Sequence, residues 1–223
     1  MLTVIKFDCF EIANIPLIIV KKKFIYLISP SKIKNSNFFK DLNKVLSLNK
    51  VSFFQLRIKK ETFNKKLIIG KKIKKITKKH DVKLLINDDP FLAKKLDADG
   101  CHLGQRDMNI NNARKILGKK KIIGVTCHNS KYLIKKAINK GANYIALGSF
   151  FKTKTKKIKY KAHLSTLNWY KNIYKLPVVA IGGINNKNYK NLLLNQADFL
   201  AISGYVWKNK NLKPHQAIKK FIK

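Results

Sequence analysis

The segment Val51-Ser-Phe-Phe-Gln-Leu-Arg-Ile-Lys59 joins a short apolar run to polar side chains at its end, Gln55, Arg57 and Lys59. Four further short apolar runs end in polar groups: Asn87-Asp88, Gly104-Gln105-Arg106-Asp107, Thr153-Lys154-Thr155-Lys156 and Gly182-Gly183. In a repeating strand-helix chain all of these groups fall on one face. Lysine, threonine, backbone glycine and two separated carboxylates suit the binding of phosphates and a divalent cation.

Eight runs of β-favouring residues, separated by lysine-rich helical patterns, predict eight strand-helix units. The strands are expected near Phe24–Ser29, Val51–Leu56, Lys83–Asn87, Asp99–Leu103, Lys121–Thr126, Asn143–Gly148, Pro177–Gly182 and Ala197–Ser203. The helical stretches include Lys65–Lys79, Ser130–Asn139 and Asn186–Leu194. Alternation of this kind implies parallel strands with right-handed crossovers, and eight units in roughly 200 residues predict an α/β fold, a single (β/α)8 TIM barrel. A doubly wound open sheet is the alternative.

Enzymes with this barrel build their sites at the carboxyl ends of the strands, with a phosphate site after strands 7 and 8. The sequence agrees, since Gly182-Gly183 closes the seventh strand and Ser203-Gly204 closes the eighth.

Length and composition predict one domain. The chain has 223 residues, 45% of them hydrophobic, which is enough for a full core. We expect the barrel to span residues 24–223, after an N-terminal extension, residues 1–23, of unknown role. The three cysteines include no Cys-x-x-Cys pair, which indicates a reduced, cytoplasmic protein. The apolar stretch Ile12–Val20 is too short to span a bilayer, so no membrane partner is expected. Assembly into a homo-oligomer is compatible with the sequence.

The formal net charge of +38 raises the alternative of a noncatalytic, basic nucleic-acid-binding protein, because lysine and arginine neutralise phosphates. Only three basic residues are arginine, and the lysines lie along nearly every predicted helix rather than in one stripe. We therefore expect no dedicated nucleic-acid partner and interpret the excess as a compositional bias towards lysine.

Six ordered motifs resemble the thiamine-phosphate synthase family, from about Phe24 to Trp207. They are Gln55-Leu56-Arg57-Ile58-Lys59, Leu85-Ile86-Asn87-Asp88, Asp99-Gly100-Cys101-His102-Leu103-Gly104-Gln105 leading to Asp107, Ile123-Gly124-Val125-Thr126, Thr153-x-Thr155-Lys156, and Val179-Ala180-Ile181-Gly182-Gly183-Ile184. The resemblance implies a transferase of thiamine biosynthesis. It would join 4-amino-5-hydroxymethyl-2-methylpyrimidine diphosphate to a thiazole phosphate, giving thiamine phosphate and diphosphate.

The resemblance also implies roles for particular residues, with these phosphorylated small molecules as substrates. Arg57 and Lys156 correspond to the catalytic cations, and Mg²⁺, the implied cofactor, corresponds to Asp88 and Asp107. The pyrimidine diphosphate would be held by Gln55, Arg57, Lys59, Asn87, Thr126 and Lys156. The thiazole phosphate would be held by Thr153, Thr155, Gly183, Ile202 and Ser203. Ile58 departs from the family pattern, which usually has an acidic residue there, and Thr126 stands where serine is usual.

Simpler interpretations remain for several of these residues. Asp88 and Asp107 each precede a predicted helix and could be helix caps. His102 and His128 are interpreted as structural. A thiazole tautomerase-like relative would share the barrel and the thiazole phosphate site without needing a metal; for that alternative, His128 is the residue of interest because imidazole can move a proton.

Overall fold

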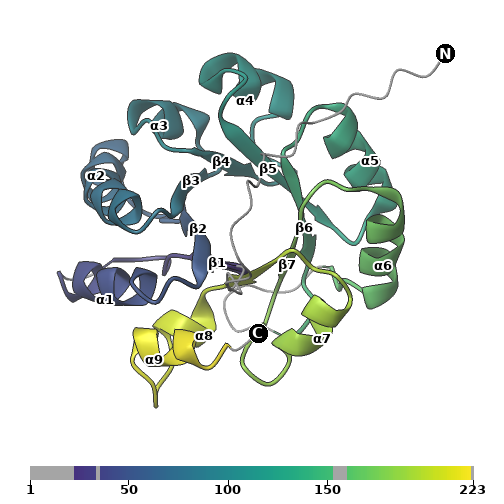
Figure 1. The fold of residues 1–223 in the computed structure, drawn as a ribbon. Helices are drawn as coiled ribbons and strands as arrows, with labels where there is room; N and C mark the ends of the chain where they lie inside the picture. The colour runs from purple at the N-terminus through teal and green to yellow at the C-terminus, as the bar shows by residue number, and fades with distance from the viewer. Residues whose placement is uncertain (1–22, 34–35, 153–159, 222–223) are drawn as a thin grey trace, which may run out of the picture.

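Eight parallel strands close into a barrel in the structure, a computed structural model that describes residues 23–33, 36–152 and 160–221 (Figure 1). The strands are β1 (Ile25–Ile28), β2 (Val51–Leu56), β3 (Lys83–Asn87), β4 (Gly100–Leu103), β5 (Ile122–His128), β6 (Tyr144–Gly148), β7 (Val178–Ile181) and β8 (Phe199–Ile202). Each strand pairs with the next along the chain, and β8 pairs with β1. The predicted (β/α)8 barrel is confirmed, as is each predicted strand.

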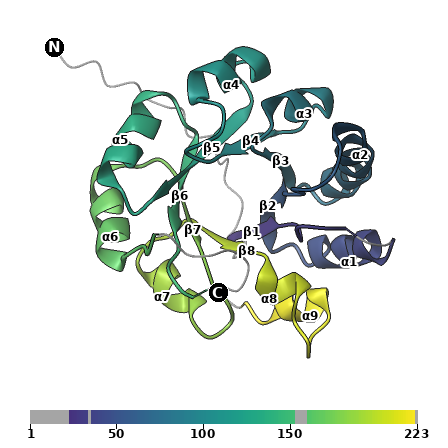
Figure 2. The same cartoon turned by 180° about the vertical axis from the view of Figure 1, so that it is seen from behind.

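The helices form a ring outside the barrel (Figures 1 and 2). In the described residues they are α1 (Asn37–Leu46), α2 (Phe63–Lys79), α3 (Pro90–Lys95), α4 (Ile110–Leu117), α5 (Lys131–Asn139), α6 (Leu164–Ile173), α7 (Tyr189–Leu194), α8 (Gly204–Trp207) and α9 (Pro214–Lys219). Four begin with a side-chain cap, an oxygen that accepts an otherwise unpaired backbone N–H. These caps are Thr62 for α2, Asp89 for α3, Asn109 for α4 and Ser130 for α5.

The barrel separates two apolar layers. On β1, Ile25 and Leu27 pack in the large layer between the barrel and the helices. Tyr26 and Ile28 belong to a smaller cluster that includes Leu85 and fills the barrel interior. Successive residues of a strand point to opposite faces, so the polar residues two positions from an inward-facing one also face the interior.

At the end of the barrel where the strands begin, the same kind of side-chain-to-backbone hydrogen bond occurs three times. The residue just before β4, β6 or β8 accepts a backbone N–H from the preceding strand. The three contacts are Asp99 with Leu84 at 2.7 Å, Asn143 with Ile123 at 2.8 Å, and Asp198 with Val178 at 2.8 Å. Each satisfies a backbone donor at a strand start, which stabilises the closed sheet.

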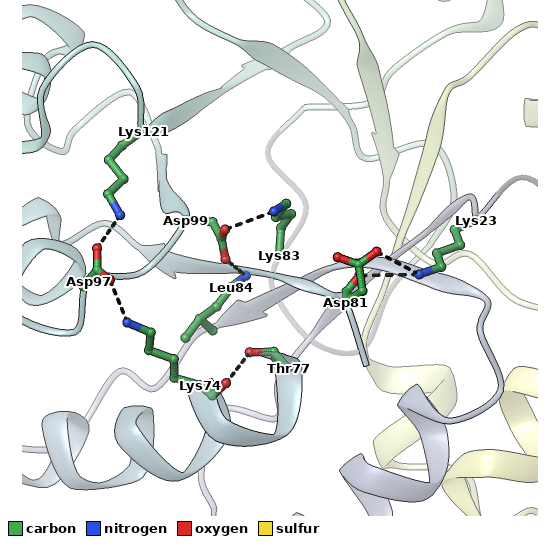
Figure 3. A network of polar contacts seen from close by, with 9 residues as sticks. All are labelled: Lys23, Lys74, Thr77, Asp81, Lys83, Leu84, Asp97, Asp99 and Lys121. Carbon is green, nitrogen blue, oxygen red and sulfur yellow. Dashed lines mark hydrogen bonds and ion pairs between the residues drawn. The ribbon is translucent and has the colours of Figure 1, made fainter. Parts of the chain in front are cut away.

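Several carboxylates also form ion pairs with lysines at this end of the barrel (Figure 3). Asp97 lies between Lys74 and Lys121 and forms ion pairs with both. Hydrogen bonds from these two lysines lower the pKa of Asp97 to about 2. These acidic side chains therefore serve the fold, far from the carboxyl ends of the strands.

The remaining predictions about domains concern the N-terminal extension, residues 1–23. It lies outside the described residues except for Lys23, which forms an ion pair with Asp81 at 3.7 Å. Within the part of the chain that the structure describes, no helix is long and apolar enough to cross a membrane.

Candidate functional site

The carboxyl end of β2 carries the first group of predicted site residues. Gln55 faces the barrel interior, is 2% exposed, and donates from Nε2 to the Tyr26 hydroxyl at 3.0 Å. Arg57 is half-buried, and burial lowers the pKa of its guanidinium while the nearby Asp88 carboxylate opposes that change. Lys59 is exposed. Ile58 packs in the apolar layer outside the barrel, so a charged side chain at this position would face a hydrophobic environment.

The end of β3 places Asn87 and Asp88 next to this group. Asn87 lies two residues beyond the inward-facing Leu85, so it also faces the interior. Asp88 adopts a positive φ of 63° and donates its backbone N–H to the His102 carbonyl at 2.8 Å. The cap of α3 is the neighbouring Asp89, not Asp88. The Asp88 carboxylate is therefore available for another role.

Asp107, in the loop after β4, faces Asp88. Its Oδ2 accepts the Gly104 N–H at 2.7 Å, and Asn109 rather than Asp107 caps α4. Burial raises the pKa of Asp88 to about 6, together with a hydrogen bond to Asp107 and the negative charge of that residue. The positive charges of Lys59 and Arg57 act in the opposite direction.

This pairing of two acids is unusual for such a basic chain. Of the 11 acidic residues, two lie outside the described ranges, and five of the other nine form ion pairs with lysine. Those five are Glu61, Asp81, Asp97, Asp99 and Asp198. Neither Asp88 nor Asp107 forms an ion pair with any described residue; instead, their carboxylates approach each other. Like charges held together disfavour ionisation, unless a cation joins them.

Thr126 projects into the interior near the end of β5. Its hydroxyl lies 2.8 Å from His102 Nε2, and the other ring nitrogen of His102 lies 2.8 Å from the Tyr144 hydroxyl. The Tyr144 hydroxyl is 2.8 Å from that of Tyr26, which also contacts Gln55. An unbroken chain of hydrogen bonds thus joins two predicted site residues on opposite sides of the barrel.

The end of β7 holds the loop after β6 close. Gly182 and Gly183 both have positive φ, 109° and 63°. A Cβ on Gly182 would lie 1.9 Å from Ser149 Oγ, and one on Gly183 would lie 2.2 Å from the Lys152 carbonyl oxygen. The two glycines are therefore required by conformation and by close approach. Thr153, Thr155 and Lys156, which follow Lys152 in the sequence, lie outside the described residues.

Ile202 and Ser203 end β8 beside β1. The Ile202 side chain belongs to the layer between barrel and helices, so only its backbone can face a ligand at the barrel mouth. Ser203 donates its hydroxyl to the Ser29 carbonyl at 3.2 Å, and Ser29 Oγ accepts the Arg57 N–H at 2.8 Å. Backbone and hydroxyl contacts thus link the mouth residues of β8, β1 and β2.

Sequence reasoning left three contributors out of the site: Tyr26, Tyr144 and Ser29, while His102 was assigned a structural role. The sequence carries one signal for Tyr144, which is Gly124. A Cβ on Gly124 would lie 1.8 Å from Tyr144 Cζ, so the glycine makes room for the phenol.

The fold and these side chains define a (β/α)8-barrel enzyme whose strand ends carry cations, paired carboxylates and close-approach glycines. The model of the thiamine monophosphate synthase family matches residues 25–206. A thiamine-phosphate synthase of Pelagibacter ubique (strain HTCC1062) is 67% identical over 201 residues, which cover 90% of this chain and 97% of the relative. The thiamine-phosphate synthase of Erythrobacter litoralis (strain HTCC2594) is 40% identical over 187 residues, covering 82% and 87%.

A solved structure agrees with these relatives. The thiamine phosphate pyrophosphorylase from Pyrococcus furiosus superposes with a TM-score of 0.77 at 29% identity, covering 89% of this chain and 93% of that chain. The chain therefore belongs to the thiamine monophosphate synthase family.

Proposed function

We propose that this protein is a transferase that couples 4-amino-5-hydroxymethyl-2-methylpyrimidine diphosphate to a thiazole phosphate, giving thiamine phosphate and diphosphate. The relatives named above support the reaction. One observation carries the assignment to this site: Asp88 and Asp107 approach each other beside Arg57 and Lys59, although lysines that could pair with them abound. Such an arrangement suits a site that holds a cation and a diphosphate together.

The donor set fits Mg²⁺, and family membership is consistent with a metal-dependent enzyme. Mg²⁺ prefers oxygen ligands and is usually held by one or two carboxylates together with substrate phosphates. Asp88 and Asp107 supply two carboxylates, and neither is used as a helix cap. The raised pKa of Asp88 supports the same conclusion, because a cation between the two groups would remove the cost of ionising both.

The reaction breaks the C–O bond between the pyrimidine methylene carbon and the diphosphate. The bonding electrons leave with the diphosphate, and the aminopyrimidine ring stabilises the resulting methylene cation. The lone pair of the thiazole nitrogen then forms the new C–N bond, and the positive charge resides on the thiazolium ring. The protein has no proton to transfer in these reaction steps, which suits a site built from charges and hydrogen-bond donors.

Neutralisation of the departing diphosphate is the main task of the protein. Arg57 and Lys59 stand at the end of β2 next to Asp88, and Lys156 is assigned to the same role from its motif. Bound Mg²⁺ would supply further neutralisation of diphosphate oxygens. Fixed charges that face developing negative charge stabilise a transition state without reorganising during the reaction.

The thiazole phosphate is assigned to the mouth between β7, β8 and the loop after β6. Gly183 brings backbone close to this loop, and no described carbonyl accepts its N–H. Ser203 adds backbone from the start of α8, and Thr153 and Thr155 are assigned hydroxyl donors from their motif. Backbone N–H groups without side chains in the way suit a phosphate. We also propose a cytoplasmic location, since the described cysteines, Cys101 and Cys127, are free thiols.

A product assay with each component omitted in turn tests the proposal. Thiamine phosphate should form only when both phosphorylated substrates and Mg²⁺ are present, with one diphosphate released per product. Undiminished product in excess chelator would contradict the metal role. Isomerisation of a thiazole phosphate with no coupling would instead select the tautomerase alternative.

A further inference from the structure

The barrel interior contains a chain of five hydrogen-bonded side chains that crosses it from β2 to β5. In order, the members are Gln55, Tyr26, Tyr144, His102 and Thr126, with contacts of 3.0, 2.8, 2.8 and 2.8 Å. The three central members are at most 9% exposed. Buried polar groups of this kind need partners, because an unpaired one costs the full desolvation of the group.

Each central member carries a fixed number of hydrogens. Burial raises the pKa of both Tyr26 and Tyr144 well above the ordinary range, so each phenol keeps its one hydrogen. Both ring nitrogens of His102 lie 2.8 Å from a hydroxyl, and the residue is 9% exposed; a charged ring buried without a paired carboxylate is costly, so the ring carries a single N–H. A neutral imidazole donates from one nitrogen and accepts at the other.

These counts give the chain a direction. Gln55 donates from Nε2 to Tyr26, and the Tyr144 hydroxyl is the only acceptor that the described residues offer to the single hydrogen of Tyr26, so that hydrogen goes to Tyr144. Tyr144 must then donate to Nδ1 of His102, which leaves the histidine hydrogen on Nε2. A second polarity exists in which every hydrogen is reversed, and it requires the Gln55 amide to accept from Tyr26 instead. The amide at one end thus determines the histidine tautomer and the role of the hydroxyl at the other end.

The two end groups of the chain, Thr126 and Gln55, have opposite hydrogen-bonding roles at the barrel mouth. Once Nε2–H of His102 donates to Thr126 Oγ1, the threonine hydrogen is available to an acceptor. Diphosphate oxygens only accept hydrogen bonds, so a hydroxyl held as a donor suits them. With Nε2 of Gln55 committed to Tyr26, the amide oxygen has no hydrogen-bond partner among the described residues and can accept from an exocyclic amino group.

We propose that Tyr26, Tyr144 and His102 are positioning residues of a polarised hydrogen-bond relay, which holds Thr126 as a donor and the Gln55 oxygen as an acceptor for the pyrimidine diphosphate. The relay selects a pyrimidine that presents an amino group over one that presents a carbonyl at the same position. This substrate reading rests on the proposed function, whereas the direction of the relay does not.

The glycine at position 124 is a further observation that supports the relay. Gly124, on β5, faces Tyr144, and a Cβ there would lie 1.8 Å from Cζ and 2.3 Å from the hydroxyl oxygen. The glycine has an ordinary strand conformation, so conformational freedom does not explain it. The glycine is explained by the space that the Tyr144 hydroxyl needs between β1 and β4.

Nitrogen NMR of the histidine rings tests the direction without any catalysis. In ¹⁵N-histidine-labelled wild-type protein near neutral pH, we expect His102 to carry its hydrogen on Nε2; the signal is assigned by its loss in His102→Asn. In Gln55→Glu the carboxylate can only accept, so the relay should reverse and the hydrogen should move to Nδ1. An Nδ1–H tautomer in the wild type, or the same tautomer in both proteins, would overturn the relay.

A second variant guards against misfolding by a buried charge. Tyr26→Phe removes the donor to Tyr144 without adding charge and should leave His102 as a mixture of tautomers. A single unchanged tautomer in this variant would also overturn the relay.

Kinetics test the substrate reading. Tyr144→Phe should raise KM for the pyrimidine diphosphate about tenfold, the effect of about 1.4 kcal/mol, and leave KM for the thiazole phosphate unchanged. Tyr170→Phe is the matched control, because it removes a buried hydroxyl of the outer layer whose one hydrogen-bond partner among the described residues is the Leu176 carbonyl, at 2.8 Å. Equal effects of the two variants on KM would contradict the positioning role. A wild type that makes no thiamine phosphate would refute the proposed function, while the tautomer result would still decide the relay.

Discussion

Asp88→Asn should abolish most activity and yet stabilise the metal-free protein. The substitution keeps the shape of the side chain and removes its charge, and asparagine tolerates the positive φ of 63° found at this position. Activity should fall by on the order of 10²-fold or more in kcat/KM, the scale of losing several kcal/mol of charge stabilisation in the transition state.

The stability gain follows from the pKa of Asp88. A rise from the ordinary 3.8 to about 6 corresponds to at most about 3 kcal/mol, at 1.36 kcal/mol per unit. The side chain is partly exposed, and solvent screening reduces this figure to about 1 to 2 kcal/mol. A carboxyl whose folded pKa is raised favours the folded state at low pH and loses that contribution as pH rises through about 6. The gain in Asp88→Asn should therefore be present at pH 7.5 and disappear below about pH 4.

Thermal unfolding in chelator, at several pH values, measures the effect. At pH 7.5 the variant should melt about 2 to 8 °C above the wild type, and added Mg²⁺ should raise the melting temperature of the wild type but not that of Asp88→Asn. Asp89→Asn is the matched control: it changes the adjacent acid, and asparagine caps a helix as well as aspartate does. A variant less stable than the wild type at pH 7.5, or a gain that persists unchanged at low pH, would refute the reasoning.

Three further predictions concern the net charge and the two phosphate sites. Because a net charge of +38 repels itself, the melting temperature should rise from low to moderate salt, where the Debye length is about 10 Å at ~0.1 M; a flat or falling curve would contradict this. Lys156→Ala should depress kcat, whereas Ser203→Ala keeps its backbone N–H and should act mildly, mainly on KM for the thiazole phosphate; intact turnover in Lys156→Ala would exclude that lysine from the leaving-group site. Gly183→Ala should raise KM for the thiazole phosphate because its Cβ would meet the Lys152 carbonyl at 2.2 Å, while Gly118→Ala, also at positive φ but with nothing within 4 Å, should leave that KM unchanged.

The strand ends were predictable because the signals that define them are local. An apolar run followed by polar residues marks where a parallel strand stops, and this pattern locates Arg57, Asn87 and Asp88 on one face of the barrel. The sequence could not decide whether Asp88 capped the next helix. That depended on which of two adjacent aspartates turned towards the backbone of α3, and Asp89 does so.

The barrel interior was not predictable for a physical reason. Strands that are buried on both faces lack the alternation that distinguishes inside from outside, so the strands of Tyr26 and Tyr144 did not themselves mark these residues as inward-facing. Their hydroxyls meet across 118 positions of sequence, a contact that local patterns do not encode. His102 likewise resembled an ordinary core histidine until its two neighbours were located.

The most direct test of the central claim is a double-variant cycle on the two carboxylates, with activity measured over a range of Mg²⁺ concentrations. If Asp88 and Asp107 hold one ion that neutralises the diphosphate, Asp88→Asn and Asp107→Asn should each lower kcat/KM by on the order of 10²-fold or more. The double variant should then lose little beyond either single variant, because residues that act as one unit are strongly non-additive. Losses that multiply, with an unchanged Mg²⁺ dependence in both single variants, would contradict the account.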